Sequence, residues 1–218
     1  MTSLEVVQDG ESSEMTVSTV GAARGLTVRD LITTGVFTAL YFVLMTVAGM
    51  IALSPVLTFA MPAAVALVTG PVYLLLVAKV PKHGPLVVLG AVLGLLVLVT
   101  GMFWLWAVAY LVCGVLADLV AGAGGFRDPR FVVASFLVFS LNPLGSYAML
   151  WIDPAAYAGY LTGKGTDPAY MATMTSTGAG WVLPAMILAT LVCALLSALF
   201  GQRLLRRQFE RAGAASVA

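Results

Sequence analysis

Apolar residues gather in six long runs separated by short polar or Gly/Pro-containing gaps, a pattern typical of a membrane protein. A helix needs about 20 mainly apolar residues to cross a bilayer. The pattern predicts an all-α, polytopic membrane protein with six transmembrane helices. These helices are expected at residues 30–53, 56–78, 86–100, 103–122, 131–151 and 181–205.

Local signals refine the first two segments. Thr27 and Asp30 form a Thr-x-x-Asp start that is typical of a helix cap, and Ser54-Pro55 ends the first segment. Pro62 and Gly70-Pro71 are expected to interrupt the second segment. Such an interruption persists in a membrane only where neighbouring helices or a cavity satisfy the released backbone groups.

The distribution of basic residues predicts which way the chain faces. Ten of the eleven Lys and Arg residues lie before the first run or after the second, fourth and sixth, and only Lys164 lies elsewhere. Cytoplasmic loops hold the excess of Lys and Arg. We therefore expect a multi-pass membrane protein with both termini cytoplasmic and an outer face poor in charge.

Composition limits the domain organisation and the partners. Hydrophobic residues make up 61% of the chain and charged residues 10%, against roughly a quarter charged in soluble domains. We expect a disordered acidic cytosolic tail at 1–26, a six-helix transmembrane domain at 27–207 and a cytosolic C-terminal tail at 208–218. With a net charge of +1 and no basic patch beyond the inner loops, the bilayer is the expected partner and nucleic acid is not.

The residues needed for catalysis or metal binding are scarce, so we expect neither an enzyme nor a cofactor. His83 is the only His, and it lies in a polar loop beside Lys82. Cys113 and Cys193 lie in apolar segments with no His there to act as a base. The spans hold too few His, Cys or carboxylate side chains for a metal site.

Besides Asp30 at the start of the first span, Asp118 is the one carboxylate in the expected spans, and it lies one turn from the inner end of the fourth. We interpret it as an ion pair or cap with Arg127 or Arg130 across the following turn. A coupling-ion site is the alternative, but a lone carboxylate near the inner rim supports it poorly.

Two small-xxx-small motifs indicate close helix contacts. Gly35-x-x-x-Ala39 in the first span could pack within the chain or dock onto another membrane subunit. Gly90-x-x-x-Gly94 in the third span is interpreted as packing within the chain.

A stripe of Ser135, Phe139, Asn142 and Ser146 follows one face of the fifth span, with Pro143 beside Asn142 near mid-bilayer. The amide could form an interhelical hydrogen bond or contact a polar ligand. Aromatic residues of the outer half could anchor the protein at the interface or line a pocket under a lid formed by residues 152–180. The candidate substrate-binding residues are Trp104, Asn142, Ser146, Tyr147, Trp151, Tyr157, Tyr160 and Trp181.

The stretch from Val28 to Val43, together with Gly70-Pro-Val-Tyr73 and Leu116-Ala-Asp-Leu119, resembles the MptD/Trep-Strep group of substrate-binding S components of energy-coupling-factor (ECF) transporters. The resemblance covers about residues 26–207. It implies an S component that captures a vitamin-like micronutrient from outside. The component would then dock on a transmembrane coupling subunit driven by two ATPases.

The docking motif of that family is Ala-x-x-x-Ala in the first helix, and Gly35-x-x-x-Ala39 is the matching stretch, with Gly in place of the first Ala. The chain contains no Gly-x-x-x-x-Gly-Lys-Ser/Thr loop, so energy must come from partners or from a gradient.

Two other functions stay open at this point. The chain could be a free-standing transporter or channel, dimerised through Gly90 and Gly94, or an accessory scaffold without a ligand. The expected outer face carries Asp153 and Asp167 against Lys164, which favours a neutral or weakly cationic ligand over a strongly anionic one.

Overall fold

The structure is a computed structural model of the 218-residue chain that describes residues 25–178 and 180–215. Within these ranges every regular element is a helix, and the predicted all-α class is confirmed. The tail predicted for residues 1–26 lies outside the described residues except for its last two positions. The elements are α1 Val28–Gly49, η1 Met50–Leu53, η2 Leu57–Ala60, α2 Met61–Lys79, α3 Pro85–Val99, α4 Trp104–Ala123, α5 Pro129–Phe139, α6 Leu144–Tyr147, α7 Met149–Ile152, α8 Pro154–Gly163, α9 Pro168–Thr177 and α10 Val182–Ala215.

In the part of the chain that the structure describes, five helical segments are long and apolar enough to cross a membrane: Val28–Leu53, Leu57–Lys79, Trp104–Ala123, Pro129–Ile152 and Val182–Leu204. Their bounds agree with the predicted ones, but α10 continues to Ala215, so most of the predicted C-terminal tail is helical. The remaining predicted segment, residues 86–100, is the shorter apolar helix α3. Its 15 residues span about 22 Å at 1.5 Å per residue, less than the roughly 30 Å of a bilayer core.

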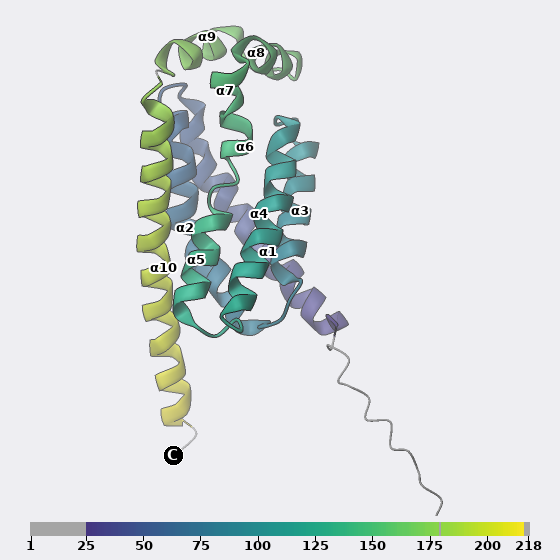
Figure 1. The fold of residues 1–218 in the computed structure, drawn as a ribbon, viewed down its shortest axis with the longest axis vertical. Helices are drawn as coiled ribbons and strands as arrows, with labels where there is room; N and C mark the ends of the chain where they lie inside the picture. The colour runs from purple at the N-terminus through teal and green to yellow at the C-terminus, as the bar shows by residue number, and fades with distance from the viewer. Residues whose placement is uncertain (1–24, 179, 216–218) are drawn as a thin grey trace, which may run out of the picture.

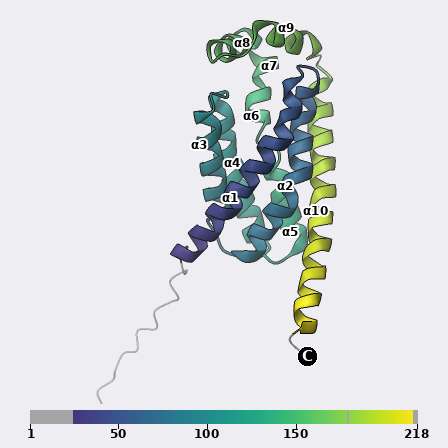
Figure 2. The ribbon, with the colours of Figure 1, turned by 180° about the vertical axis from the view of Figure 1, so that it is seen from behind.

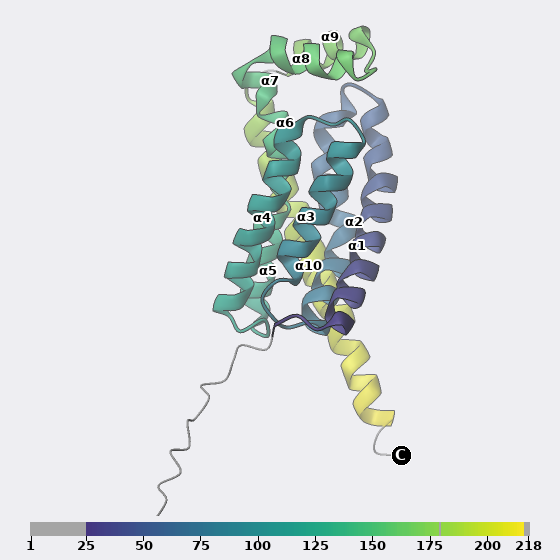
Figure 3. The same cartoon turned by 90° about the vertical axis from the view of Figure 1, so that its right-hand side faces the viewer.

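The long helices run lengthwise in one bundle, and α8 and α9 lie across one end of it (Figure 1). The start of α1 and the end of α10 lie at the opposite end (Figure 3). From behind, α1 crosses obliquely in front of the other helices, so one of its sides is uncovered (Figure 2).

The segment predicted as a long loop contains two helices instead. Asp153 and Asp167 cap α8 and α9, because their carboxylates accept hydrogen bonds from the N–H groups of Ala156 and Ala169 at 2.9 and 2.8 Å. A proline follows each aspartate and occupies the first turn of its helix, where its missing N–H costs nothing. The two Asp-Pro pairs are therefore the sequence pattern from which these helices could have been predicted.

The interruption predicted at Gly70-Pro71 is wrong, because α2 runs unbroken through Pro71. The one predicted at Pro62 corresponds to the change from the 3₁₀ helix η2 to α2, which has Pro62 in its first turn. Proline lacks an N–H, so the carbonyl of Leu67, four residues earlier, loses its helical partner. The Ser197 hydroxyl of α10 donates to that carbonyl at 2.6 Å. The neighbouring helix thus takes up the released group, as the membrane requires.

Glycines bring α3 and α4 into backbone contact, which confirms that Gly90 and Gly94 pack within the chain. A Cβ atom on Gly90 would collide with the carbonyl oxygen of Tyr110, and one on Gly94 would lie 2.8 Å from that of Ala107. On α4, a Cβ at Gly114 would lie 2.9 Å from the Leu86 carbonyl oxygen.

Asp118 does not pair with Arg127 or Arg130 as predicted. It is buried, and its carboxylate accepts hydrogen bonds from the Gly84 N–H at 2.9 Å and from His83 Nδ1 at 2.8 Å. The α2–α3 loop is also held by Lys82, whose Nζ lies 2.7 Å from Asp30 Oδ2 at the start of α1. Asp118 therefore fixes the loop between α2 and α3 to α4.

We expect Asp118→Ala to lower the free energy of unfolding by about 2 kcal/mol, because the Gly84 N–H loses its acceptor. The apparent melting temperature in detergent should fall by about 4–8 °C. His83→Ala is the matched control: it keeps the bond to Gly84 and should lower the temperature by less than half as much. An unchanged melting temperature for Asp118→Ala would show that the carboxylate does not hold this loop.

Candidate functional site

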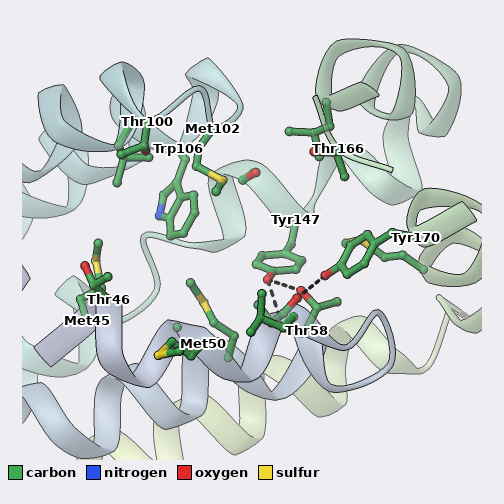
Figure 4. A pocket seen from close by; sticks show the side chains of 18 of the residues that line it. Met45, Thr46, Met50, Thr58, Thr100, Met102, Trp106, Tyr147, Thr166 and Tyr170 are labelled. Carbon is green, nitrogen blue, oxygen red and sulfur yellow. Dashed lines mark hydrogen bonds between the residues drawn. The ribbon is translucent and has the colours of Figure 1, made fainter. Parts of the chain in front are cut away.

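A cavity of about 590 Å³ lies beneath α8 and α9. One side is formed by the end of α1 with η1, η2 and the start of α2, and the other by the end of α3, the α3–α4 turn and the start of α4. Residues from α6, α8 and α9 close the remaining sides (Figure 4). Its volume lies within the range of small-molecule sites.

The cavity wall is apolar, with hydroxyl groups distributed over it. Among the described residues, those lining the cavity include no Asp, Glu, Lys, Arg or His. Methionine side chains contribute a large part of the apolar surface, and such side chains adapt to ligands of different shape. These methionines are Met45, Met50, Met61, Met102 and Met174.

Three predicted site residues lie on the wall: Ser146, Tyr147 and Tyr157. The Tyr147 hydroxyl donates to the Thr58 carbonyl at 3.0 Å and lies 3.0 Å from the Thr58 hydroxyl (Figure 4). These bonds fasten α6 to η2. The two residues are 89 positions apart, so their contact could not be predicted from the sequence.

Tyr157 brings α8 to the same wall. Its hydroxyl lies 3.3 Å from that of Ser146. Burial raises the pKa of the Tyr157 phenol above its ordinary value, and the bond to Ser146 offsets part of this shift. The phenol therefore stays protonated near neutral pH and keeps its hydrogen for bonding.

Asn142 lies behind the wall and does not line the cavity. Its amide oxygen accepts the Trp106 indole N–H at 2.8 Å, and its amide nitrogen donates to the Phe139 carbonyl at 2.7 Å. The interhelical hydrogen bond, one of the two interpretations of this residue, is the one the structure contains. Because Trp106 itself lines the cavity, Asn142 positions an indole that faces the interior.

Trp151 and Tyr160 pack between the cap helices and the bundle, away from the cavity. The Trp151 indole donates to the Gly178 carbonyl at 3.1 Å and lies over Phe59, with ring centroids 6.2 Å apart. Tyr160 packs edge-on against Phe103 at 5.0 Å. Both side chains help to seat α8 and α9 on the bundle.

Trp104 and Trp181 point away from the cavity. Their exposed fractions are 49% and 71%, and neither lines the wall. This placement suits the interfacial anchoring that was the alternative interpretation for both residues.

The wall contains residues that sequence reasoning did not select, chiefly Thr58, Trp106 and Tyr170. Trp106 shares a helical face with the buried Tyr110 and Gly114, so the helical period separates it from Trp104. Tyr170 donates to the Ala52 carbonyl at 2.7 Å and joins α9 to η1. No local signal marks Thr58 or Tyr170.

The cavity reaches the surface at one side of the bundle. The exposed members of its wall include Thr46 and Met50 near the end of α1, and Thr100 and Met102 on the α3–α4 turn. The opening therefore lies between these two segments, below the cap formed by α8 and α9. Rings, sulfurs and hydroxyls arranged in this way bind a ligand by shape and by hydrogen bonds.

Gly35 and Ala39 are exposed on α1, while Thr34 and Thr38 of the same helix are buried. A Cβ on Gly35 would have no neighbour within 4 Å. Packing of this motif within the chain is therefore wrong, and its small surface faces outward.

Comparison with family models gave one match, to the family described as "Hypothetical bacterial integral membrane protein (Trep_Strep)", over residues 28–211. Comparisons with curated proteins and with solved structures gave no match. The matched range runs from the first residue of α1 into the last turns of α10 and includes the cavity and its cap. The chain therefore belongs to the Trep_Strep family of bacterial integral membrane proteins.

Proposed function

We propose that this protein is the membrane-embedded substrate-binding component of an ECF-type importer. It would capture a vitamin-like micronutrient from outside and dock on a transmembrane coupling subunit that carries two ATPases. The observation that carries the proposal is the uncharged cavity of about 590 Å³ beneath the α8–α9 cap. A capped cavity of this size has the dimensions of a small-molecule site, and the proposal gives it a ligand that is bound and released unchanged.

The proposal includes six membrane crossings with both termini cytoplasmic. The loops that contain Lys82 and Arg127 lie at the end of the bundle where α1 begins, and Lys164 lies at the other end, close to Gly101. This distribution supports an inner face at the start of α1. Helix α3 connects the two ends despite its length, so it would be the sixth crossing.

The exposed surface of α1 supports docking on a partner subunit. Gly35 and Ala39 leave a shallow strip on a helix face that no part of the described chain covers. Small residues permit close approach of two membrane helices. The strip extends along α1 toward Thr46 and Met50, which belong to the cavity wall, so one helix would contact both the partner and the ligand.

The two alternative functions fit the structure less well. A transporter dimerised through Gly90 and Gly94 would need those glycines on the surface, but α4 already packs on both. A scaffold without a ligand would have no use for a cavity of this size.

Purification from native membranes in a mild detergent tests the proposal. We expect the tagged chain to bring with it one membrane subunit and two P-loop ATPases, with ATP hydrolysis in the complex and a co-purifying small molecule identified by mass spectrometry. The chain alone, reconstituted in vesicles, should bind that molecule without accumulating it. Accumulation by the isolated chain would contradict the proposal.

A further inference from the structure

Three hydroxyl groups of the cavity wall, those of Thr58, Tyr147 and Tyr170, already donate their hydrogens within the protein. Tyr147 donates to the Thr58 carbonyl, so in the contact between the two hydroxyls Thr58 must be the donor to Tyr147. Tyr170 donates to the Ala52 carbonyl at 2.7 Å. A ligand that contacts these three side chains would therefore find hydrogen-bond acceptors and no free donor.

The same holds for the Trp106 N–H on the opposite wall and for Thr46 and Thr100 at the rim, whereas the hydroxyl of Thr166, on the α8–α9 turn, has no acceptor among the described residues. The Trp106 N–H is bound by Asn142 at 2.8 Å. The hydroxyls of Thr46 and Thr100 donate to carbonyls of their own helices at 2.8 and 2.7 Å. An anionic group on a ligand would thus find few donors and no positive side chain, and burial of an unpaired charge is strongly unfavourable.

One hydroxyl hydrogen of the Ser146–Tyr157 pair has no acceptor in the part of the chain that the structure describes. Ser146 and Tyr157 share a single hydrogen bond at 3.3 Å, and each has one hydroxyl hydrogen, so one of the two hydrogens has no acceptor among the described residues. It belongs to a pair that lines the cavity. This pair can donate one hydrogen bond to a ligand.

The three charged residues on which the prediction of a neutral or weakly cationic ligand rested lie outside the cavity wall. Asp153 and Asp167 cap helices, and the Lys164 Nζ lies 5.8 Å from the centre of the Tyr160 ring. None of the three lines the cavity. A cationic ligand therefore has no carboxylate to meet there either.

We propose that the cavity binds an uncharged, largely apolar ring compound with one hydrogen-bond acceptor directed at the Ser146–Tyr157 pair. Rings would pack against Trp106 and the methionine side chains, which gives stacking and sulfur–aromatic contacts. The acceptor, a carbonyl or ether oxygen, would take the remaining hydroxyl hydrogen. This inference rests on the proposed function and specifies the chemical class of its substrate.

Two dyes with the same rings and different charge test the class. N-phenylnaphthylamine is uncharged, and anilinonaphthalene sulfonate is the same molecule with an anionic group. Binding to the full chain in phosphatidylcholine nanodiscs is measured by fluorescence, with empty nanodiscs subtracted. We expect the uncharged dye to bind one per chain and at least about tenfold more tightly than its sulfonate, because the cavity offers the charge no partner.

A variant localises this binding to the cavity. Thr46 is exposed at the rim, and its hydroxyl bonds only its own helix, so Thr46→Trp should fold normally and fill the opening. We expect it to lower binding of the uncharged dye at least about tenfold. Thr33→Trp is the matched control, because Thr33 bonds its own helix in the same way at 2.9 Å and does not line the cavity.

Prodan, an uncharged naphthalene with a ketone, tests the acceptor. The double variant Ser146→Ala/Tyr157→Phe removes the hydrogen and should weaken prodan binding about five- to tenfold. N-phenylnaphthylamine lacks the ketone, and its affinity should change less than about twofold, which separates loss of the hydrogen bond from loss of fold.

Equal or tighter binding of the sulfonate, or no binding of either uncharged dye, would overturn the ligand class. Equal loss of both uncharged dyes in the double variant would overturn the acceptor site. Neither result would affect the proposed function if the partner ATPases still co-purify with the chain. Their absence would overturn the proposed function whatever the dyes do.

Discussion

Ala39→Trp should remove the partner subunits from the purified protein while its cavity still binds N-phenylnaphthylamine. An indole on the Gly35–Ala39 strip would hold a partner helix several ångströms away and prevent close packing. Within the chain the change is expected to cost little, because Ala39 is exposed and the space above Gly35 is empty. We expect the amount of co-purified ATPase per chain to fall at least about tenfold and the dye affinity to stay within about twofold. Quantitative mass spectrometry measures the co-purified ATPase, and fluorescence titration measures the dye affinity.

The matched control is Leu40→Trp on the same turn of α1. Leu40 is 44% exposed, and as the residue next to Ala39 it points to a different side of the helix, so its indole would contact lipid. Co-purification should remain within about twofold of that of the unaltered chain. Equal loss of partners in both variants would show that any added bulk on α1 disturbs the protein, and retention in both would place docking elsewhere.

Gly90→Ala should be among the most destabilising single-methyl changes in this chain. The new Cβ would overlap the Tyr110 carbonyl oxygen and would also lie 3.1 Å from the Gly114 Cα, closer than ordinary van der Waals contact. Both neighbours are backbone, so no side chain can rotate aside and the helices must separate. We expect a loss on the order of 3 kcal/mol and an apparent melting temperature lower by about 10 °C.

Gly35→Ala is the control for this change. It adds the same methyl to a membrane helix where nothing lies within 4 Å, so its melting temperature should stay equal or rise slightly because alanine favours helix. The variant also recreates the Ala-x-x-x-Ala form of the docking motif, and partner binding should persist. If Gly90→Ala melts like Gly35→Ala, α3 and α4 are not in close backbone contact at Gly90.

The positions of the helical segments could be predicted because they depend on local apolar runs. The continuity of α2 through Pro71 could not be predicted, because the hydrogen bond that supports it comes from Ser197, 130 positions away from the Leu67 carbonyl. The helices α8 and α9 were within reach of prediction, since Asp153-Pro154 and Asp167-Pro168 are local capping signals.

The candidate site was predicted only in part for a similar reason. Aromatic residues near one end of the spans are expected both in a pocket and at a membrane interface, and only the helical period separates the two, as it does for Trp104 and Trp106. The wall also depends on Tyr170 meeting Ala52 across 118 positions. Contacts of that kind follow from the assembled bundle and leave no pattern in a single segment.

The bond between Ser197 and the Leu67 carbonyl has a mechanical consequence. A slide of α10 along α2 by one helical turn would leave that carbonyl without a partner inside the membrane, where an unpaired group is strongly unfavourable. At Gly70 and Gly201 the two helices pack so closely that an added Cβ atom would crowd the other helix. We therefore expect α2 and α10 to keep one register and move as a single rigid body. Any rearrangement that opens the cavity would then fall to α1 and the α8–α9 cap.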